Sequence, residues 1–163
     1  MSEQPQAMSG AEQARAEEVL QSEPIAYLAL SDEGPYVIPV CFVYEKGDDD
    51  IDRGRVLIHT GEGRKSRALA LDDRVCLAVA ADPALYLGRE PCRDGFTFRS
   101  VLVEGRATLL QGREEREAAL RAIVAKYDPE AADRPFAEKD LQATLVYAVL
   151  IDSISYRQQL PRN

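Results

Sequence analysis

The chain has 163 residues, of which 45% are hydrophobic and 29% are charged, a composition typical of a folded globular protein. The 28 acidic residues outnumber the 20 Lys and Arg, so the net charge is −8. An acidic chain without a basic stretch does not favour DNA or RNA binding, because neutralisation of phosphates drives that binding. No run approaches the roughly 20 apolar residues that span a bilayer, and the polar start, Met1–Gly10, lacks the pattern of a secretory signal.

These features, with a length typical of one domain, predict a single cytoplasmic domain over residues 1–163, with residues 1–8 disordered. The three cysteines, Cys41, Cys76 and Cys92, show neither CxxC nor CxH spacing, so no zinc site is predicted. Cys41 and Cys76 lie within apolar runs. We therefore expect both to be reduced thiols buried in the core.

The first part of the chain has the pattern of a helix followed by a hairpin. Ser9–Glu12 has the S-x-x-E form of a capping box, which begins a helix that ends near residue 21. Two apolar runs of strand length follow at Ile25–Leu30 and Tyr36–Tyr44, joined by a turn. Pro39 lies inside the second run, and a proline there indicates an edge strand, a bulge or an interrupted ladder.

The rest of the chain alternates strands with short helices. Gly105 falls inside the longest strand pattern and indicates a bulge or a close approach of another main chain. Because only one helix lies where a parallel crossover needs it, the pattern favours a closed or partly closed antiparallel barrel. The predicted strands are Arg55–His59, Val75–Ala80, Phe96–Leu110 and Leu145–Ile151, and the predicted helices are Arg64–Leu71, Arg113–Tyr127 and a weaker Ala137–Gln142.

The segment Leu57–Ser66 carries the clearest chemistry. A strand ends at His59, a turn with two glycines follows, and a helix begins with Arg64 and Lys65. The first turn of a helix has unpaired N–H groups and a partial positive charge, so this helix start suits a phosphate. A surface turn with two solvated cations remains the alternative. His59, the only histidine in the chain, is either a structural residue at a strand end or a functional one.

Four segments in order resemble a known family. They are Val37–Tyr44, Leu57–Ser66, Asp73–Leu77 and Arg99–Ala107. With this spacing the chain resembles the FMN-binding split-barrel family from about residue 25 to residue 151. The branch it resembles is that of the pyridoxamine 5′-phosphate oxidase-related proteins, which includes the nitroimidazole-resistance, or nitroimidazole reductase, proteins.

The resemblance implies a mostly β fold, a six-stranded antiparallel split barrel, that forms a homodimer with FMN at the subunit interface. It implies that His59 lies beside the cofactor and is the catalytic residue. The cofactor-binding residues that it implies are Pro39, Val40, Cys41 and Phe42 along the ring or the ribityl chain, His59 near the cofactor at the end of its strand, Gly63, Arg64 and Lys65 at the phosphate, and Arg99, Ser100 and Val101 from the long strand.

The chain also departs from the family pattern. It has no tryptophan, and its end, Ser155–Asn163, lacks the tryptophan- and arginine-containing segment of true pyridoxamine 5′-phosphate oxidases. Vitamin B6 oxidation is therefore not expected. The leading hypothesis is an FMN-dependent oxidoreductase that reduces a small planar or nitroaromatic compound with an external donor such as NAD(P)H.

Three alternatives remain open at this point. The chain could be a flavin carrier or sensor without turnover, or a structural dimer with an empty groove. It could also be a haem-binding split barrel with His59 as axial ligand, although the Arg64–Lys65 pair argues for a phosphate instead.

Overall fold

The structure, a computed structural model, describes residues 8–48 and 53–161. Of the start that was expected to be disordered, residues 1–8, only Met8 is therefore described, and it packs against the core. The described residues form one seven-stranded sheet in the order β2-β1-β5-β6-β7-β4-β3. The strands are β1 (Ile25–Ser31), β2 (Pro35–Cys41), β3 (Val43–Glu45), β4 (Arg55–Thr60), β5 (Arg74–Tyr86), β6 (Gly95–Leu109) and β7 (Leu145–Gln159).

Every strand pairing in this sheet is antiparallel, which confirms the predicted fold class. The seventh strand arises because the run at 36–44 is divided at Phe42. The part before Phe42 pairs with β1, and the part after it pairs with β4. Pro39 lies on β2, an edge strand of the sheet, as its sequence context indicated.

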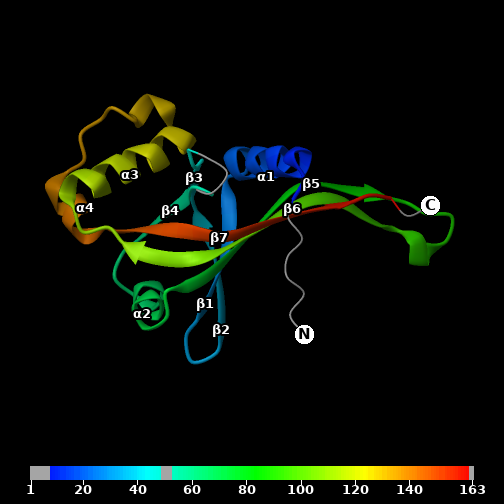
Figure 1. The fold of residues 1–163 in the computed structure, drawn as a ribbon, viewed down its shortest axis with the longest axis horizontal. Coiled ribbons are helices and arrows are strands. Elements are labelled where there is room, and N and C mark those ends of the chain that lie inside the picture. Colours follow the sequence, from blue (N-terminus) through cyan, green and yellow to red (C-terminus); the bar gives the residue numbers. More distant parts are fainter. Residues whose placement is uncertain (1–7, 49–52, 162–163) are drawn as a thin grey trace.

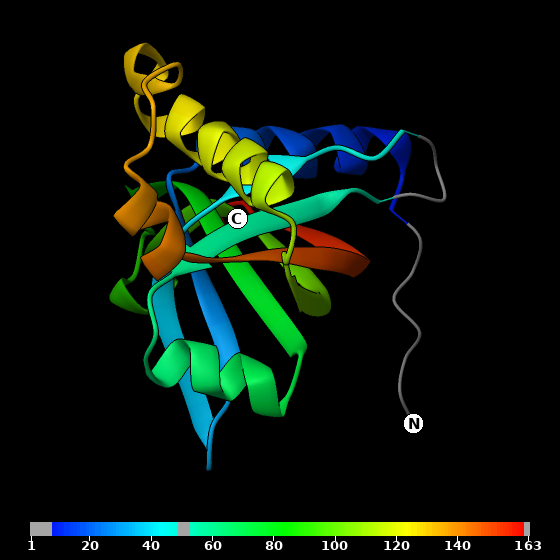
Figure 2. The same ribbon diagram turned by 90° about the vertical axis from the view of Figure 1, so that its left-hand side faces the viewer.

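The two edges of the sheet, β2 and β3, are consecutive in the chain and are separated by a single residue, Phe42. The sheet must therefore curl until its two ends meet, which gives a split barrel rather than a flat sheet (Figure 2). Phe42 is itself completely buried. The point where the barrel is split is thus also one of the best-packed points of the core.

Alternate residues of each strand point to the inside of the barrel. The inner face holds a core that includes Leu28, Phe42, Ile58, Val101 and Val103, each 1% exposed or less. The residues between these inward ones point to the other side of the sheet, which is called the outer face below. The sequence pattern predicts that Val101, Val103 and Gly105 share one face of β6. The structure confirms this, since all three are buried.

Four helices in the described residues flank the sheet (Figures 1 and 2). Helix α1 packs on the inner core, and its capping box is formed: Ser9 N–H donates to Glu12 at 2.9 Å, and Glu12 N–H donates to Ser9 Oγ at 3.3 Å. Helices α3 and α4 cover a second core on the outer face of β4 and β7. The bounds are α1 (Gly10–Ser22), α2 (Arg64–Leu71), α3 (Arg113–Tyr127) and α4 (Glu138–Ala143), with short 3₁₀ turns at Pro91–Arg93 and Pro129–Ala131. No helix in the described part of the chain is long and apolar enough to cross a membrane.

Strands β5 and β7 are longer than their sequence patterns predict, and with β6 they extend beyond the barrel as a ribbon-like arm (Figure 1). The pairing of β5 with β6 shifts register between Ala81 and Ala84 and then continues to Tyr86. A second shift lies beside Gly105, where a Cβ atom would come within 2.1 Å of the Leu150 carbonyl oxygen. The predicted bulge or close approach at Gly105 is confirmed.

Candidate functional site

The start of helix α2 has the features of an anion site. Strand β4 ends at Thr60, and the chain passes through two glycines before the helix begins at Arg64. The first helical hydrogen bond runs from Arg67 N–H to Gly63 O at 3.1 Å, so the main-chain N–H groups of residues 64–66 precede the helical ladder. No acidic side chain lies in this first turn. A phosphate would meet free donors and the positive end of the helix dipole here.

Lys65 adds a cation to this helix start. Its Nζ donates to the His59 carbonyl oxygen at 3.3 Å, and no carboxylate in the described part of the chain forms an ion pair with it. Burial lowers the pKa of Lys65, because its ammonium group is partly removed from water. An anion beside Nζ would offset this desolvation, so the residues present fit a phosphate group.

His59 lies beside Lys65 at the end of β4, where it pairs with Val146 of β7. Its side chain is partly exposed to solvent and partly covered by its neighbours. Partial burial lowers the pKa of His59, and the positive charge of Lys65 lowers it further. The imidazole is therefore neutral at pH 7, with one ring nitrogen able to donate a hydrogen bond and the other able to accept one.

Arg64 contacts other groups than Lys65 does. Its Nε donates to Asp32 at 2.5 Å, and its guanidinium lies 4.2 Å from the centroid of the Tyr36 ring. The hydrogen bond to Asp32 raises the pKa of Arg64. Two adjacent cations that look equivalent in the sequence thus differ in the structure, because Arg64 is held by the β1–β2 hairpin while Lys65 is not.

The segment Pro39–Phe42 presents only two of its four side chains to the outside. Val40 and Phe42 are buried in the core, whereas Pro39 and Cys41 are exposed on the outer face. Lys65 lies near Cys41, since a negative charge at the Cys41 sulfur would raise the pKa of Lys65. Only Pro39 and Cys41 can therefore contact a ligand on this face through their side chains, and Val40 and Phe42 can do so only through the main chain.

The expectation that Cys41 and Cys76 are buried thiols is wrong. Cys41 is exposed and Cys76 is only partly buried, because both occupy outward positions on strands whose neighbouring residues fill the core. Cys92 is exposed as well, and all three thiols are free.

Arg99, Ser100 and Val101 lie far from His59 within one chain. His59 pairs with Val146 of β7, and the Val146 carbonyl oxygen accepts a hydrogen bond from the N–H of Leu110, the residue that follows β6. His59 therefore lies at the same height in the sheet as Leu110. Ten residues of extended chain separate Leu110 from Ser100, which corresponds to about 30 Å. Arg99 is bound by Asp82 at 2.6 Å and by Glu18 at 3.0 Å. Val101 is completely buried, so Ser100 is the member of this group that reaches the outer face.

Sequence reasoning missed two residues near this site, Lys126 and Tyr127 in the last turn of α3. Lys126 Nζ lies 3.7 Å from the centroid of the Phe42 ring, and Tyr127 Oη accepts a hydrogen bond from Phe42 N–H at 2.8 Å. In the sequence Tyr127 fits the apolar face of its helix. Because its hydroxyl partner lies 85 residues away, no local pattern could have identified the contact.

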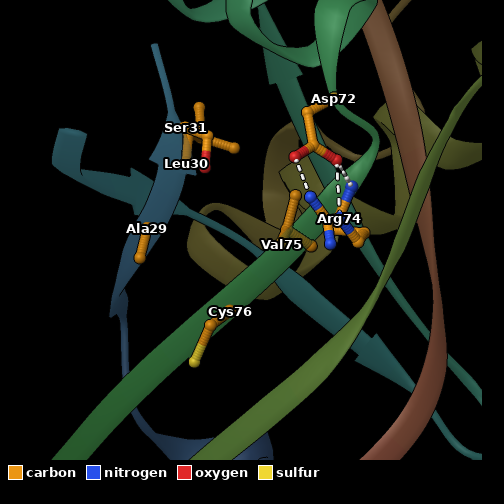
Figure 3. A pocket seen from close by; sticks show the side chains of 7 residues that line it. All are labelled: Ala29, Leu30, Ser31, Asp72, Arg74, Val75 and Cys76. Atoms are coloured by element: carbon orange, nitrogen blue, oxygen red, sulfur yellow. Dashed lines mark hydrogen bonds and ion pairs between the residues drawn. The ribbon is translucent and has the colours of Figure 1, made fainter. Parts of the chain in front are cut away.

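A hollow of about 380 Å³ opens at the other end of α2, lined by residues of β1 and β5 (Figure 3). Its two charged side chains pair with each other: Arg74 donates to the Asp72 carboxylate at 2.9 and 2.7 Å. These bonds lower the pKa of Asp72 to about 2. The hollow therefore offers no unpaired charge to a ligand, unlike the start of α2.

Comparison with known proteins agrees with this architecture. A candidate 5-nitroimidazole antibiotic resistance protein from Bacteroides thetaiotaomicron superposes with a TM-score of 0.73 at 22% identity, over 88% of this chain and 81% of that one. The flavocytochrome Anf3 from Azotobacter vinelandii gives 0.76 at 28% identity, over 91% and 67%. A FAD and heme binding protein from Mycobacterium smegmatis gives 0.77 at 25% identity, over 92% and 73%.

A search among curated proteins finds no match. The sequence model of the pyridoxamine 5′-phosphate oxidase family, however, matches residues 12–158, nearly the whole chain. The match includes the start of α2 and all seven strands, except for the last residue of β7. This chain belongs to the pyridoxamine 5′-phosphate oxidase family.

Proposed function

We propose that this protein binds FMN, with the phosphate at the start of α2, and that it reduces a small planar or nitroaromatic compound. The observation that carries the proposal is Lys65, a half-buried cation that pairs with no carboxylate of residues 8–48 and 53–161 and lies beside the N–H groups of a helix start. Membership of the family supports a flavin, as do relatives described as a flavocytochrome and as a FAD and heme binding protein.

In this proposal Lys65 and the N–H groups of residues 64–66 hold the phosphate. Pro39 and Cys41 then face the rest of the cofactor from the outer side of β2. FMN supplies hydride and electron transfer when bound, with NAD(P)H as the external donor, while the protein supplies orientation and control of water. While neutral, the imidazole of His59 donates a hydrogen bond to the compound that is reduced, and its protonated form would donate a proton.

The proposal includes a homodimer, and the outer face of the sheet supports it. One row of outward residues crosses five neighbouring strands, and among them Tyr27 is 53% and Leu102 is 44% exposed. A second copy packed on this row would cover apolar surface, and it would bring Ser100 of one chain towards the α2 start of the other. The row consists of Pro39, Tyr27, Ala78, Leu102 and Ser155.

The test is a titration of purified protein with FMN and with riboflavin, which lacks the phosphate. We expect FMN to bind more tightly in the wild type, and Lys65→Ala to weaken FMN binding ten- to hundredfold, because a charge-assisted hydrogen bond contributes about 1.5–3 kcal/mol. Riboflavin binding should not change. Lys139→Ala, which removes an exposed lysine of α4, is the control. Equal affinities for FMN and riboflavin in the wild type would contradict the phosphate site.

A second measurement concerns turnover. In His59→Ala we expect FMN to remain bound while reduction of a nitroaromatic compound per bound FMN falls about 10²- to 10⁴-fold, because a positioned acid or base contributes that much. Turnover within twofold of the wild type would remove His59 from the reaction. A wild type that binds FMN but reduces none of a nitroaromatic panel would be a carrier or sensor.

Haem binding is the second candidate, and the exposed, neutral imidazole of His59 favours it as a metal ligand. Two relatives are described as a flavocytochrome and as a FAD and heme binding protein. The absorption spectrum of reconstituted protein separates the two cases, and His59→Ala should abolish only the haem spectrum.

A further inference from the structure

We infer that Tyr127 is a positioning residue for the proposed cofactor site: its hydroxyl fixes the main chain of Phe42, and thereby the place of Cys41 relative to Lys65. The inference rests on the proposed function. Tyr127 ends helix α3, and Phe42 is the residue at which the chain passes from one edge of the sheet to the other.

The first step of the argument is the hydrogen bonding of Phe42. This residue belongs to neither β2 nor β3, and it has no partner in the register of either strand pairing. Its N–H donates to Tyr127 Oη at 2.8 Å, and its carbonyl oxygen lies 2.9 Å from the same hydroxyl. Because Phe42 is completely buried, the loss of the hydroxyl would leave two main-chain groups without a partner in the core.

The second step is the anchoring of the hydroxyl itself. Tyr127 Oη also lies 2.7 Å from the carbonyl oxygen of Pro24, the residue before β1. Its single proton is therefore shared by two carbonyl oxygens, one just before β1 and one between β2 and β3. Lys126 holds the same turn of α3 in place, since its Nζ donates to the Leu20 carbonyl oxygen at 3.3 Å and lies 3.7 Å from the centroid of the Phe42 ring. The junction of the barrel is thus tied to α1, β1 and α3 at once.

The third step connects this junction to the phosphate site. Cys41 directly precedes Phe42 and faces outward. Cys41 lies near Lys65 of α2 and Lys126 of α3, since a negative charge at its sulfur would raise the pKa of each lysine. A shift of the Phe42 main chain would therefore move the outward side of β2 relative to Lys65. Tyr127 itself faces the main chain rather than the phosphate, so its effect on a flavin should not depend on the phosphate.

The test compares Tyr127→Phe with Tyr44→Phe. The control also removes a tyrosine hydroxyl that donates to a main-chain carbonyl, but the carbonyl is that of Arg53 at 3.3 Å rather than that of Phe42 or Pro24. In Tyr127→Phe we expect FMN and riboflavin to bind five- to thirtyfold more weakly, with the ratio of the two affinities unchanged. In Tyr44→Phe both affinities should stay within twofold of the wild type. Lys65→Ala should instead change the ratio.

Amide hydrogen exchange of the protein without flavin gives a readout that does not depend on binding. In the wild type the Phe42 amide, although outside the strand pairing, should exchange as slowly as the paired amides of β1. In Tyr127→Phe the exchange rate over residues 41–43 should rise at least tenfold. The exchange rates of the β6 amides should stay unchanged. The wild-type measurement decides the matter even if the variant does not fold.

Fast exchange of Phe42 in the wild type, or flavin affinities in Tyr127→Phe equal to those of the wild type, would overturn the inference while the proposed function stands. A wild type that binds neither flavin would overturn both.

Discussion

The two halves of the sheet differ in what covers their outward side chains. On β4 and β7, Leu57, Val146 and Ala148 point outward but are buried, because α3 and α4 pack over them. On β1 and β6, Tyr27 and Leu102 also point outward, and about half of each side chain is exposed. Outward apolar residues alternate with inward ones in both halves. Helices of the same chain cover them in one half, whereas in the other half no described helix does.

This difference explains how one fold can provide both stability and a binding face. Burial under α3 and α4 fixes the β4 strand that ends at His59, so the candidate site starts from a rigid element. The bare half leaves an apolar row available to a second copy, as proposed above. Outward apolar residues in the two halves should consequently respond to mutation in different ways.

The largest effect is expected in the bare half, from Leu102→Glu. In the proposed dimer this change buries a carboxylate without a partner in each subunit, at a cost of several kcal/mol per ion. The dissociation constant should rise at least a thousandfold, so light scattering at micromolar concentration should give the mass of a monomer. Leu71→Glu, at a residue of α2 that is 79% exposed, is the control and should leave the mass unchanged. A wild type that is already monomeric would contradict the proposed dimer.

In the covered half, Leu57→Ala should lower the free energy of unfolding by about 2–4 kcal/mol. Leu57 is completely buried under α3, and removal of its side chain leaves a cavity that the packed helix cannot close. Denaturant unfolding at two protein concentrations measures the effect. The loss relative to wild type should be the same at both concentrations, whereas that of Leu102→Glu should vary with concentration. Leu71→Ala should change stability by less than about 0.5 kcal/mol.

The sequence predicts the covered half better than the bare half. Helix α3 begins and ends where the helical pattern placed it, at Arg113 and Tyr127, because its apolar spacing is a local signal. In the bare half, strand β5 and the outer part of β7 continue to Tyr86 and Gln159, well beyond their apolar runs. Their outer parts are polar or contain Pro83, and pairing with β6 holds them extended. Such long-range pairing cannot be read from local pattern.

The candidate site shows the same limit. The strand, turn and helix around Lys65 are local and were predictable, as was the suitability of the helix start for an anion. The engagement of Arg64 with Asp32 and Tyr36 depends on a hairpin that lies about 30 residues away in the chain. The separation of Ser100 from His59 likewise depends on strand order and register, which the sequence pattern does not specify.

The smallest effect is expected from Lys126, the half-buried cation where the covered half meets the barrel junction. Burial lowers the pKa of Lys126 to about 8, below its ordinary value of 10.5 in the unfolded chain. Between pH 8 and pH 10.5 the unfolded state therefore binds more protons than the folded state, and the contribution of Lys126 to stability rises with pH in this window and is lost as the pH falls through 8. Since the group is partly solvated and its ammonium also lies on the Phe42 ring, the rise should be on the order of 1 kcal/mol.

Other groups titrate in the same range, so the Lys126 effect has to be isolated by difference. Burial raises the pKa of Cys76 and of Tyr147, and each of these lowers stability as the pH rises. In Lys126→Met those contributions remain while that of Lys126 disappears. The difference in unfolding free energy between wild type and Lys126→Met should therefore move in favour of the wild type from pH 7 to pH 10. If the difference in unfolding free energy stays constant over this range, the Lys126 ammonium is as well solvated in the folded protein as in the unfolded chain. In that case α3 covers the junction less tightly than its contacts indicate.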